Sequence, residues 1–173
     1  VGPGLEPAPS EFVGRLLEGF DGPMVVDAGA IGAITRLDSI LERSAPTVLT
    51  PHAGEFKRLA GVEADHVEAM RLADATGAVV TLKGNPTFVA GRSLVVVDAG
   101  GPELASIGTG DVLAGVIAAL LADGIEPELA AATGAHIHAR AGSRLAATTT
   151  VTAAALVDAV GRVVAGLGSD SIR

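Results

Sequence analysis

The sequence predicts an α/β fold whose mostly parallel sheet is flanked by helices on both faces. Short β-branched runs alternate with longer segments of helical periodicity, which is typical of βαβ units with right-handed crossovers. Hydrophobic residues make up 49% of the chain and aromatic residues 2%, so Val, Leu, Ile and Ala must build the core. The length of 173 residues suits one domain with a substantial core.

Turn residues bound each of the predicted strands. Pro51 ends the second strand, because proline cannot donate a hydrogen bond to a sheet ladder. Gly91 and Arg92 form the predicted turn of a hairpin between the last two strands. The predicted strands cover residues 23–27, 47–50, 78–82, 87–90 and 93–97.

The segments between these strands have the periodicity of helices. Gly77 is a typical C-terminal stop, and Asp123 with Gly124 ends the strongest helical pattern. The predicted helices cover residues 31–42, 52–60, 63–76, 109–122, 126–141 and 151–167. The tail, residues 168–173, is expected to fray.

Polar or glycine-rich segments follow several predicted strands at their carboxyl ends. Asp27, His52 and Lys83 each come directly after a strand, and Gly108 precedes a helix. Ligands of open α/β sheets bind beyond the carboxyl ends of the strands. We therefore expect these segments to converge on one rim of the sheet.

The segment Gly108-Thr109-Gly110-Asp111 starts a predicted helix and is the strongest candidate for a phosphate and acid/base centre. Glycines let the backbone approach a ligand, and a helix start offers unpaired N–H groups and a positive dipole end. Asp111 could accept a proton from a hydroxyl that attacks phosphorus. The alternative is an ordinary helix start in which Asp111 only complements the dipole.

The segment from Thr50 to Glu55 places two polar side chains at a strand end. We expect His52 to face a substrate and Glu55 to hold the loop or a metal-bound water. In the alternative, Thr50 caps the following helix and Glu55 favours its first turn. Direct metal ligation by His52 and Glu55 is not expected, because a spacing of three residues alone does not make a site.

A third candidate segment is a predicted nucleotide-binding loop. It consists of Lys83, Gly84, Asn85, Pro86 and Thr87, with backbone groups and Thr87 near phosphate or ribose. The alternative is a plain hairpin entry with an Asn-Pro turn. The spacing differs from that of a Walker P-loop.

Two further residues, Asp27 and Gly4, have two interpretations each, and two histidines have a structural one. Asp27 either belongs to the site or caps the next turn, and Gly4 lies either in a tight loop near a ligand or in a frayed terminus. His136 and His138 are two residues apart on a helix, so they point to different faces. We expect both histidines to be packing or surface residues without a shared metal.

Composition and charge argue against several classes of protein. The net charge of -8, without a basic stripe, argues against a nucleic-acid partner. Without cysteine the chain has no disulfide, thiolate metal site or cysteine nucleophile. No apolar run is long enough for a membrane span and no signal peptide is recognised, which predicts a cytoplasmic protein without a membrane partner. The first residue is not Met, so an N-terminal truncation is expected.

Several motifs together resemble the ADP/ATP-dependent NAD(P)H-hydrate dehydratase family, which has the ribokinase-like fold. The resemblance extends from Gly2 to the C-terminal helix and implies that residues 1–173 are the C-terminal major part of a single dehydratase domain. The motifs that carry it are Gly2-Pro-Gly-Leu, Val25-Val-Asp-Ala, Thr50-Pro-His-Ala-Gly-Glu-Phe-Lys-Arg-Leu, Leu82-Lys-Gly-x-x-Thr87 and Gly108-Thr-Gly-Asp-Val-Leu-Ala-Gly115.

The resemblance implies a repair enzyme that acts on the S epimer of hydrated NADH or NADPH. The hydroxyl of the hydrated ring would be phosphorylated by ADP, in bacterial members, or by ATP, and the phosphate would then leave. Asp111 would take the hydroxyl proton, N–H groups from Gly108 to Gly110 would stabilise the phosphoryl group, and Mg2+ would bridge nucleotide oxygens without a direct protein ligand.

The same resemblance implies the binding residues and partners. Gly4, His52 and Asp111 would contact the hydrate. The segment from Lys83 to Thr87, with Gly110, would contact the adenine nucleotide. A homo-oligomer is implied, with a tetramer among the options, and so is a fused or partner epimerase domain.

The chain departs from the family pattern at three points. A segment that usually precedes Gly-Pro-Gly is absent, Ile107 stands where many members have glycine, and Gly29 replaces a frequent aspartate. The first departure puts independent activity in question. Two alternatives therefore stay open: a kinase of the same fold for a vitamin-precursor alcohol, and a non-catalytic nucleotide-binding module.

Overall fold

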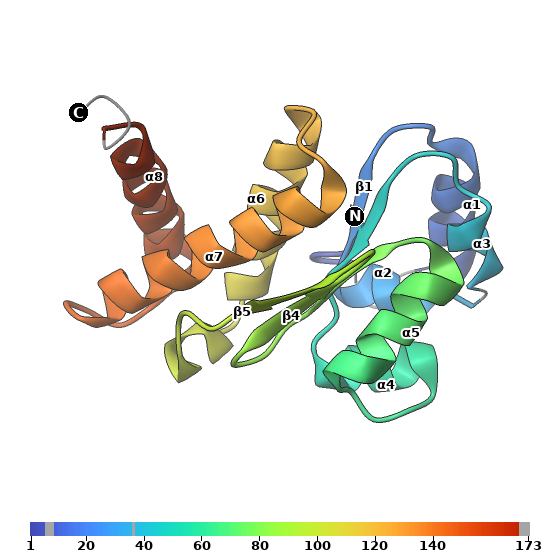
Figure 1. The fold of residues 1–173 in the computed structure, drawn as a ribbon, viewed down its shortest axis with the longest axis horizontal. Helices are drawn as coiled ribbons and strands as arrows, with labels where there is room; N and C mark the ends of the chain where they lie inside the picture. The colour runs from blue at the N-terminus through green and yellow to red at the C-terminus, as the bar shows by residue number, and fades with distance from the viewer. Residues whose placement is uncertain (6–8, 36, 170–173) are drawn as a thin grey trace.

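The computed structural model describes residues 1–5, 9–35 and 37–169, so part of the predicted frayed tail, residues 170–173, lies outside the described residues. Its centre is a sheet in the order β1-β2-β3-β4-β5 (Figure 1). The strands are β1 (Met24–Val26), β2 (Thr47–Leu49), β3 (Val79–Leu82), β4 (Thr87–Ala90) and β5 (Leu94–Val97). All the predicted strands are present, with ends shifted by at most one residue.

The sheet is mixed. The pairs β1–β2 and β2–β3 are parallel, whereas β3–β4 and β4–β5 are antiparallel. Of the two antiparallel pairs, β4–β5 is the hairpin that the turn residues Gly91 and Arg92 predicted. The parallel half carries the expected architecture, in which three strands end at one edge after crossovers through helices.

From α4 onward the helices match the expected pattern apart from the short η1, which was not predicted, whereas the segments before α4 differ from it. A helix at residues 10–19 was not predicted, although Val13 and Leu17 recur at helical spacing on its buried face. The predicted helix at residues 31–42 is wrong as a single element, since the backbone becomes extended at Ile34. The helices are α1 (Ser10–Gly19), α2 (Ala28–Ala33), α3 (Asp38–Leu41), α4 (Ala53–Ala60), α5 (His66–Thr76), η1 (Pro102–Ala105), α6 (Thr109–Ala122), α7 (Pro127–Ala146) and α8 (Ala153–Ser169).

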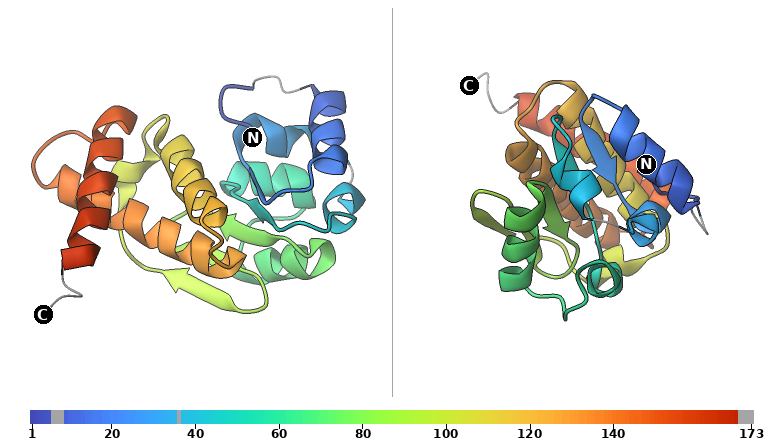
Figure 2. Two further views of the ribbon diagram at one scale, coloured as in Figure 1. Left: turned by 90° about the horizontal axis from the view of Figure 1, so that it is seen from above. Right: turned by 90° about the vertical axis from the view of Figure 1, so that its right-hand side faces the viewer.

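Helices cover both faces of the sheet, as predicted (Figure 2). Alternate residues of each strand point to opposite faces. In β3, Val80 packs with the helices of the first half of the chain, and its neighbour Val79 packs with α6 and α7. The last helix, α8, lies beyond α7 and away from the sheet, where Leu156 and Val163 pack against the outer side of α7 (Figure 1).

Arg43 holds the connection between α1 and β1. Its guanidinium donates to the carbonyl oxygens of Leu17, Phe20 and Gly22 at 2.6–2.9 Å and to the Thr47 hydroxyl at 2.9 Å. Burial lowers the pKa of Arg43, and the nearby Asp21 carboxylate opposes that change. One side chain therefore satisfies backbone acceptors that helix ends and loops otherwise leave to solvent.

We expect Arg43→Ala to lower the free energy of unfolding by about 3 kcal/mol, because it removes charge-assisted hydrogen bonds to three carbonyls. Urea denaturation measures this difference. Arg58→Ala is the matched control, since Arg58 is exposed on α4 and makes no side-chain hydrogen bond to any other described residue. Equal losses in the two variants would contradict the role of Arg43.

None of the helices in the described ranges is both long and apolar enough to cross a membrane.

Candidate active site

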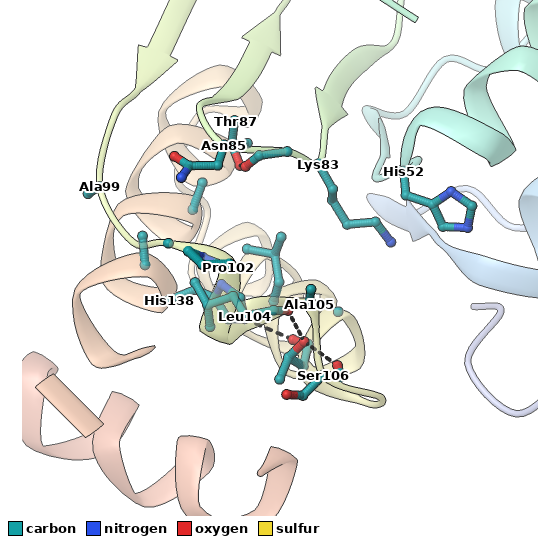
Figure 3. A pocket seen from close by; sticks show the side chains of 17 residues that line it. His52, Lys83, Asn85, Thr87, Ala99, Pro102, Leu104, Ala105, Ser106 and His138 are labelled. Carbon is teal, nitrogen blue, oxygen red and sulfur yellow. Dashed lines mark hydrogen bonds between the residues drawn. The ribbon is translucent and has the colours of Figure 1, made fainter. Parts of the chain in front are cut away.

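The carboxyl ends of the parallel strands meet on one rim, as the sequence predicted. Past β2 and β3, the Lys83 N–H donates to the Pro51 carbonyl at 2.8 Å, and His52 and Lys83 form an isolated parallel bridge. Figure 3 shows the two side chains leaving adjacent strand ends, with Lys83 extended toward the side on which His52 lies. The loop that precedes α6 lies across this space.

Lys83 is the centre of a polar cluster at this rim. Its Nζ lies 2.7 Å from Asp27 Oδ1 and 3.7 Å from Glu55 Oε2. The Thr50 hydroxyl also donates to Asp27 Oδ1, at 2.8 Å. Asp27 is 1% exposed, and a buried carboxylate needs such partners. Asp27 therefore belongs to the rim cluster, and its side chain makes no capping hydrogen bond to α2.

His52, and not Thr50, is the N-cap of α4. Its Nδ1 accepts hydrogen bonds from the backbone N–H groups of Gly54 at 2.9 Å and Glu55 at 3.2 Å. Glu55 completes a capping box by accepting from the His52 N–H at 2.8 Å. Because Nδ1 accepts, the neutral ring carries its proton on Nε2, and the half-exposed side chain can present that donor to a ligand.

The start of α6 has the features of an anion-binding cradle. In the described part of the chain, the backbone N–H groups of Gly110 and Asp111 have no hydrogen-bond partner, whereas the N–H of Thr109 donates to Ser106 O. A Cβ on Gly110 would lie 3.4 Å from Lys83 Nζ, so the lysine ammonium faces the helix start. Open N–H groups, a helix dipole and a cation together favour a phosphate.

Gly108 shapes the turn into this cradle. Its φ of 83° lies in the left-handed region, and a Cβ would approach Ala153 Cβ at 3.0 Å. A side chain at this position would be both strained and crowded. Thr109 is 2% exposed, and its hydroxyl lies 2.6 Å from Leu104 O and 2.7 Å from Ser106 O. The Thr109 hydroxyl is thus used inside the loop and does not face the cradle.

A pocket of about 450 Å³ lies between the Lys83 loop, η1 and the first turn of α6. It contains much of the predicted site and an apolar wall from η1 and α7 that the sequence did not reveal. The predicted residues that line it are His52, Lys83, Gly84, Asn85, Thr87, Thr109 and Gly110. The wall includes Ala99, Pro102, Leu104, Leu113, Ala135 and Ala139. Such a wall suits the flat apolar face of a nucleotide base.

The remaining predicted residues lie around this pocket without lining it. Asp27 and Glu55 stand behind Lys83, and Pro86 and Gly108 contribute backbone shape. Asp111 is exposed on the first turn of α6, directly after Gly110. Gly4 is exposed in a turn beside the end of β1, where Val1 O accepts from the Asp27 N–H at 3.0 Å.

His138 is a buried packing residue, one of the two roles expected for it, but the sequence analysis did not predict that it lines the pocket. It is 7% exposed, lines the pocket, and its Nε2 lies 2.8 Å from the Thr109 carbonyl oxygen. His136 is exposed, so the two histidines do point to different faces, as predicted. Helical spacing could have found His138, because it shares a buried stripe with Ala131 and Ala135.

Burial lowers the pKa of His138 below its ordinary value of 6.5; the hydrogen bond to Thr109 opposes this shift and the Lys83 charge adds to it. Below pH 6.5 the unfolded chain binds a proton that the folded chain does not bind, so the free energy of unfolding decreases as the pH is lowered. Above pH 6.5 this contribution is fully present. We expect His138→Gln to flatten the slope in urea titrations between about pH 5 and 7, and His136→Gln to leave it unchanged.

The donor set at the rim suits a magnesium ion that takes most of its ligands from phosphates and water. Asp27 and Glu55 both hold the Lys83 ammonium, which shows that this corner favours cations. Among the described residues no three His, Asp or Glu side chains gather into a metal cage. Nucleotide-bound Mg2+ needs only one or two protein carboxylates, directly or through water.

The sequence matches known proteins along nearly its whole length. The model of the NAD(P)H-hydrate dehydratase family matches residues 1–162. The bifunctional NAD(P)H-hydrate repair enzyme Nnr of Salinibacter ruber is 44% identical over 178 residues, which cover 95% of this chain and 33% of the relative. The ADP-dependent (S)-NAD(P)H-hydrate dehydratase of Xanthomonas campestris is 40% identical, with 84% of this chain and 53% of the relative covered.

Solved structures agree with these matches. The ADP/ATP-dependent NAD(P)H-hydrate dehydratase of Bacillus subtilis, co-crystallised with ATP and Mg2+, superposes with a TM-score of 0.82 at 31% identity over 94% of this chain and 63% of its own. Ribokinase of Thermotoga maritima, at 20% identity and a TM-score of 0.61, shares the fold. The chain spans about a third of the first of these relatives. The fold is therefore ribokinase-like, and the chain belongs to the NAD(P)H-hydrate dehydratase family.

Proposed function

We propose that this chain carries the site for ADP- or ATP-dependent dehydration of the S epimer of hydrated NADH and NADPH. The observation that supports it most is the cradle at the start of α6. Two open backbone N–H groups, at Gly110 and Asp111, lie beside the Lys83 ammonium and directly before an exposed carboxylate. Open N–H groups and an ammonium stabilise a phosphoryl group during its transfer, and a carboxylate can accept the proton of the hydroxyl that attacks it.

The proposed reaction has two steps. Asp111 accepts the proton as the ring hydroxyl attacks the terminal phosphorus of the nucleotide, whose bond to the bridging oxygen breaks. The cradle stabilises the charge on the transferring phosphoryl group. The carbon–oxygen bond then breaks, phosphate leaves, and loss of a ring proton restores the dihydropyridine. The net change is removal of water, at the cost of one phosphoanhydride bond.

The pocket suggests which residues bind each of the two substrates. Lys83, Gly84, Asn85, Pro86 and Thr87 with Gly110 would hold the adenine nucleotide, whose base would lie on the apolar wall. Gly4, His52 and Asp111 would contact the hydrate, and His52 Nε2 is a suitable donor for it. Mg2+ would neutralise phosphate charge, and Glu55 would hold one of the waters bound to it.

Further proposals concern the whole protein. Because the relatives are longer, residues 1–173 are proposed to be the C-terminal major part of one dehydratase domain. Bifunctional relatives support a fused or partner epimerase domain. A homo-oligomer, with a tetramer among the options, and a cytoplasmic location complete this proposal.

The decisive assay mixes the full chain with hydrated NADH, Mg2+ and either ADP or ATP, and follows the return of absorbance of the reduced nicotinamide. Recovery with one nucleotide supports the dehydratase. No recovery with either, together with phosphorylation of a vitamin-precursor alcohol, would indicate the kinase of the same fold. Nucleotide binding without any turnover would indicate a non-catalytic module.

A further inference from the structure

The search for a further functional residue leads to the contact between α7 and the first turn of α6. His138 on α7 makes the 2.8 Å hydrogen bond to the Thr109 carbonyl described above, 29 residues away along the chain. Since a carbonyl oxygen only accepts, the His138 Nε2 must carry the proton and donate. This donor reaches the residue directly before the two open N–H groups.

The backbone N–H, the hydroxyl and the carbonyl oxygen of Thr109 all make hydrogen bonds. Its N–H donates to Ser106 O at 3.3 Å, its hydroxyl is bound to the η1 turn, and its carbonyl accepts from His138. The first two contacts are local and fix Thr109 only to its own loop. The His138 contact is the one that anchors the turn to another element of the core.

The protonation state of His138 suits this anchor. The ring is buried against α6 and η1, and the charged group that faces it is the Lys83 ammonium. A neutral ring adds no positive charge to the cradle, so its contribution is geometric. A misplacement of about 1 Å in a transfer site can cost on the order of 100-fold in rate.

We propose that His138 is a positioning residue for phosphoryl transfer: through Thr109 it holds the open N–H groups of α6 where the transferring group develops charge. The expected effect on kcat rests on the proposed function. The expected ordering of the first turn of α6 rests only on the hydrogen bond between His138 and Thr109. His138 acts through the backbone of α6 and takes no part in proton transfer.

The test compares His138→Phe, which keeps the ring volume and loses the donor, with His138→Gln, whose amide can still donate to Thr109. His136→Phe is the matched control, because His136 lies on the same helix and is exposed. Hydrated NADH turnover gives kcat and KM, and hydrogen exchange of the Val112 and Leu113 amides reports the first turn of α6 without any substrate.

We expect His138→Phe to lower kcat about 10- to 100-fold with both KM values within about three-fold, and to speed exchange at Val112 and Leu113. His138→Gln should keep kcat within about five-fold of the original. Equal losses in His136→Phe and His138→Phe, or an unchanged exchange rate in His138→Phe, would overturn the proposal.

The two proposals can fail separately. If the unaltered chain turns over no hydrate, the proposed function fails, and the exchange measurement still decides whether His138 orders α6. If His138→Phe does not fold, His138→Gln decides: rescue of kcat and exchange supports the anchor, and loss of both in a folded variant rejects it.

Discussion

Asp111→Asn is expected to lower kcat for hydrate dehydration by about 10²- to 10⁴-fold, because an amide cannot accept the hydroxyl proton. The Asp111 side chain is exposed and makes no hydrogen bond within residues 1–5, 9–35 and 37–169, so the near-isosteric change should leave the fold intact. The Gly110 and Asp111 N–H groups and the Lys83 ammonium remain, and nucleotide affinity should stay within about three-fold. Stopped-flow turnover and calorimetric nucleotide titration measure the two quantities.

Asp123→Asn is the control for this experiment. Asp123 is also exposed on α6, but it caps the opposite end of the helix, far from the cradle. It should keep normal turnover. If Asp111→Asn retained normal kcat, Asp111 could not be the base, although the cradle could still bind the phosphoryl group. If it lost nucleotide binding and turnover together, the carboxylate would act in binding rather than in proton transfer.

Lys83→Met is expected to have the largest effect on stability, with a loss of about 4 kcal/mol in the free energy of unfolding. Its Nζ is the only cation within 4 Å of the Asp27 carboxylate in the described part of the chain, and Asp27 is 1% exposed. Methionine fills the same volume but leaves a buried charge with the Thr50 hydroxyl as its side-chain donor. Urea denaturation at neutral pH measures the loss.

A double variant separates the two roles of Lys83. Asp27→Asn added to Lys83→Met removes the unpaired charge and should recover most of the lost stability. It should not recover nucleotide affinity, because the ammonium that faces Gly110 is still missing. Lys57→Met, at an exposed lysine of α4, is the control and should change neither quantity. An equal loss of affinity for nucleotide and hydrate would contradict the proposed division of the pocket.

Much of the fold could be predicted because its signals are local. β-branched runs, the Pro51 stop and the Gly91–Arg92 turn gave strands that the structure contains. Helix α1 was missed although its apolar residues, among them the buried Val13 and Leu17, recur at helical spacing. The break at Ile34 was missed because helical spacing of apolar residues continues across it. Short elements depend on what they pack against, which a local pattern does not contain.

The segments that form the candidate site were predicted, but the side-chain contacts between them were not. The carboxyl ends of parallel strands share an edge, so Asp27, His52 and Lys83 could be expected together. That Lys83 turns to Asp27 and Glu55 as well as to Gly110 depends on side-chain geometry across 56 residues of sequence. Likewise, Thr50 was a reasonable cap for α4, but the observed cap is His52.

The sequence by itself determined the five strands, the helices from α4 onward apart from η1, the family, and the motif that starts α6, because these depend on local periodicity and on residues adjacent in the chain. Only the tertiary structure decided that Gly110 and Asp111 present open N–H groups, that Lys83 is shared between a buried carboxylate and the cradle, and that His138 anchors Thr109. Those contacts join distant segments, and whether a donor lies 3 Å or 8 Å from its acceptor is set by how helices pack on the sheet.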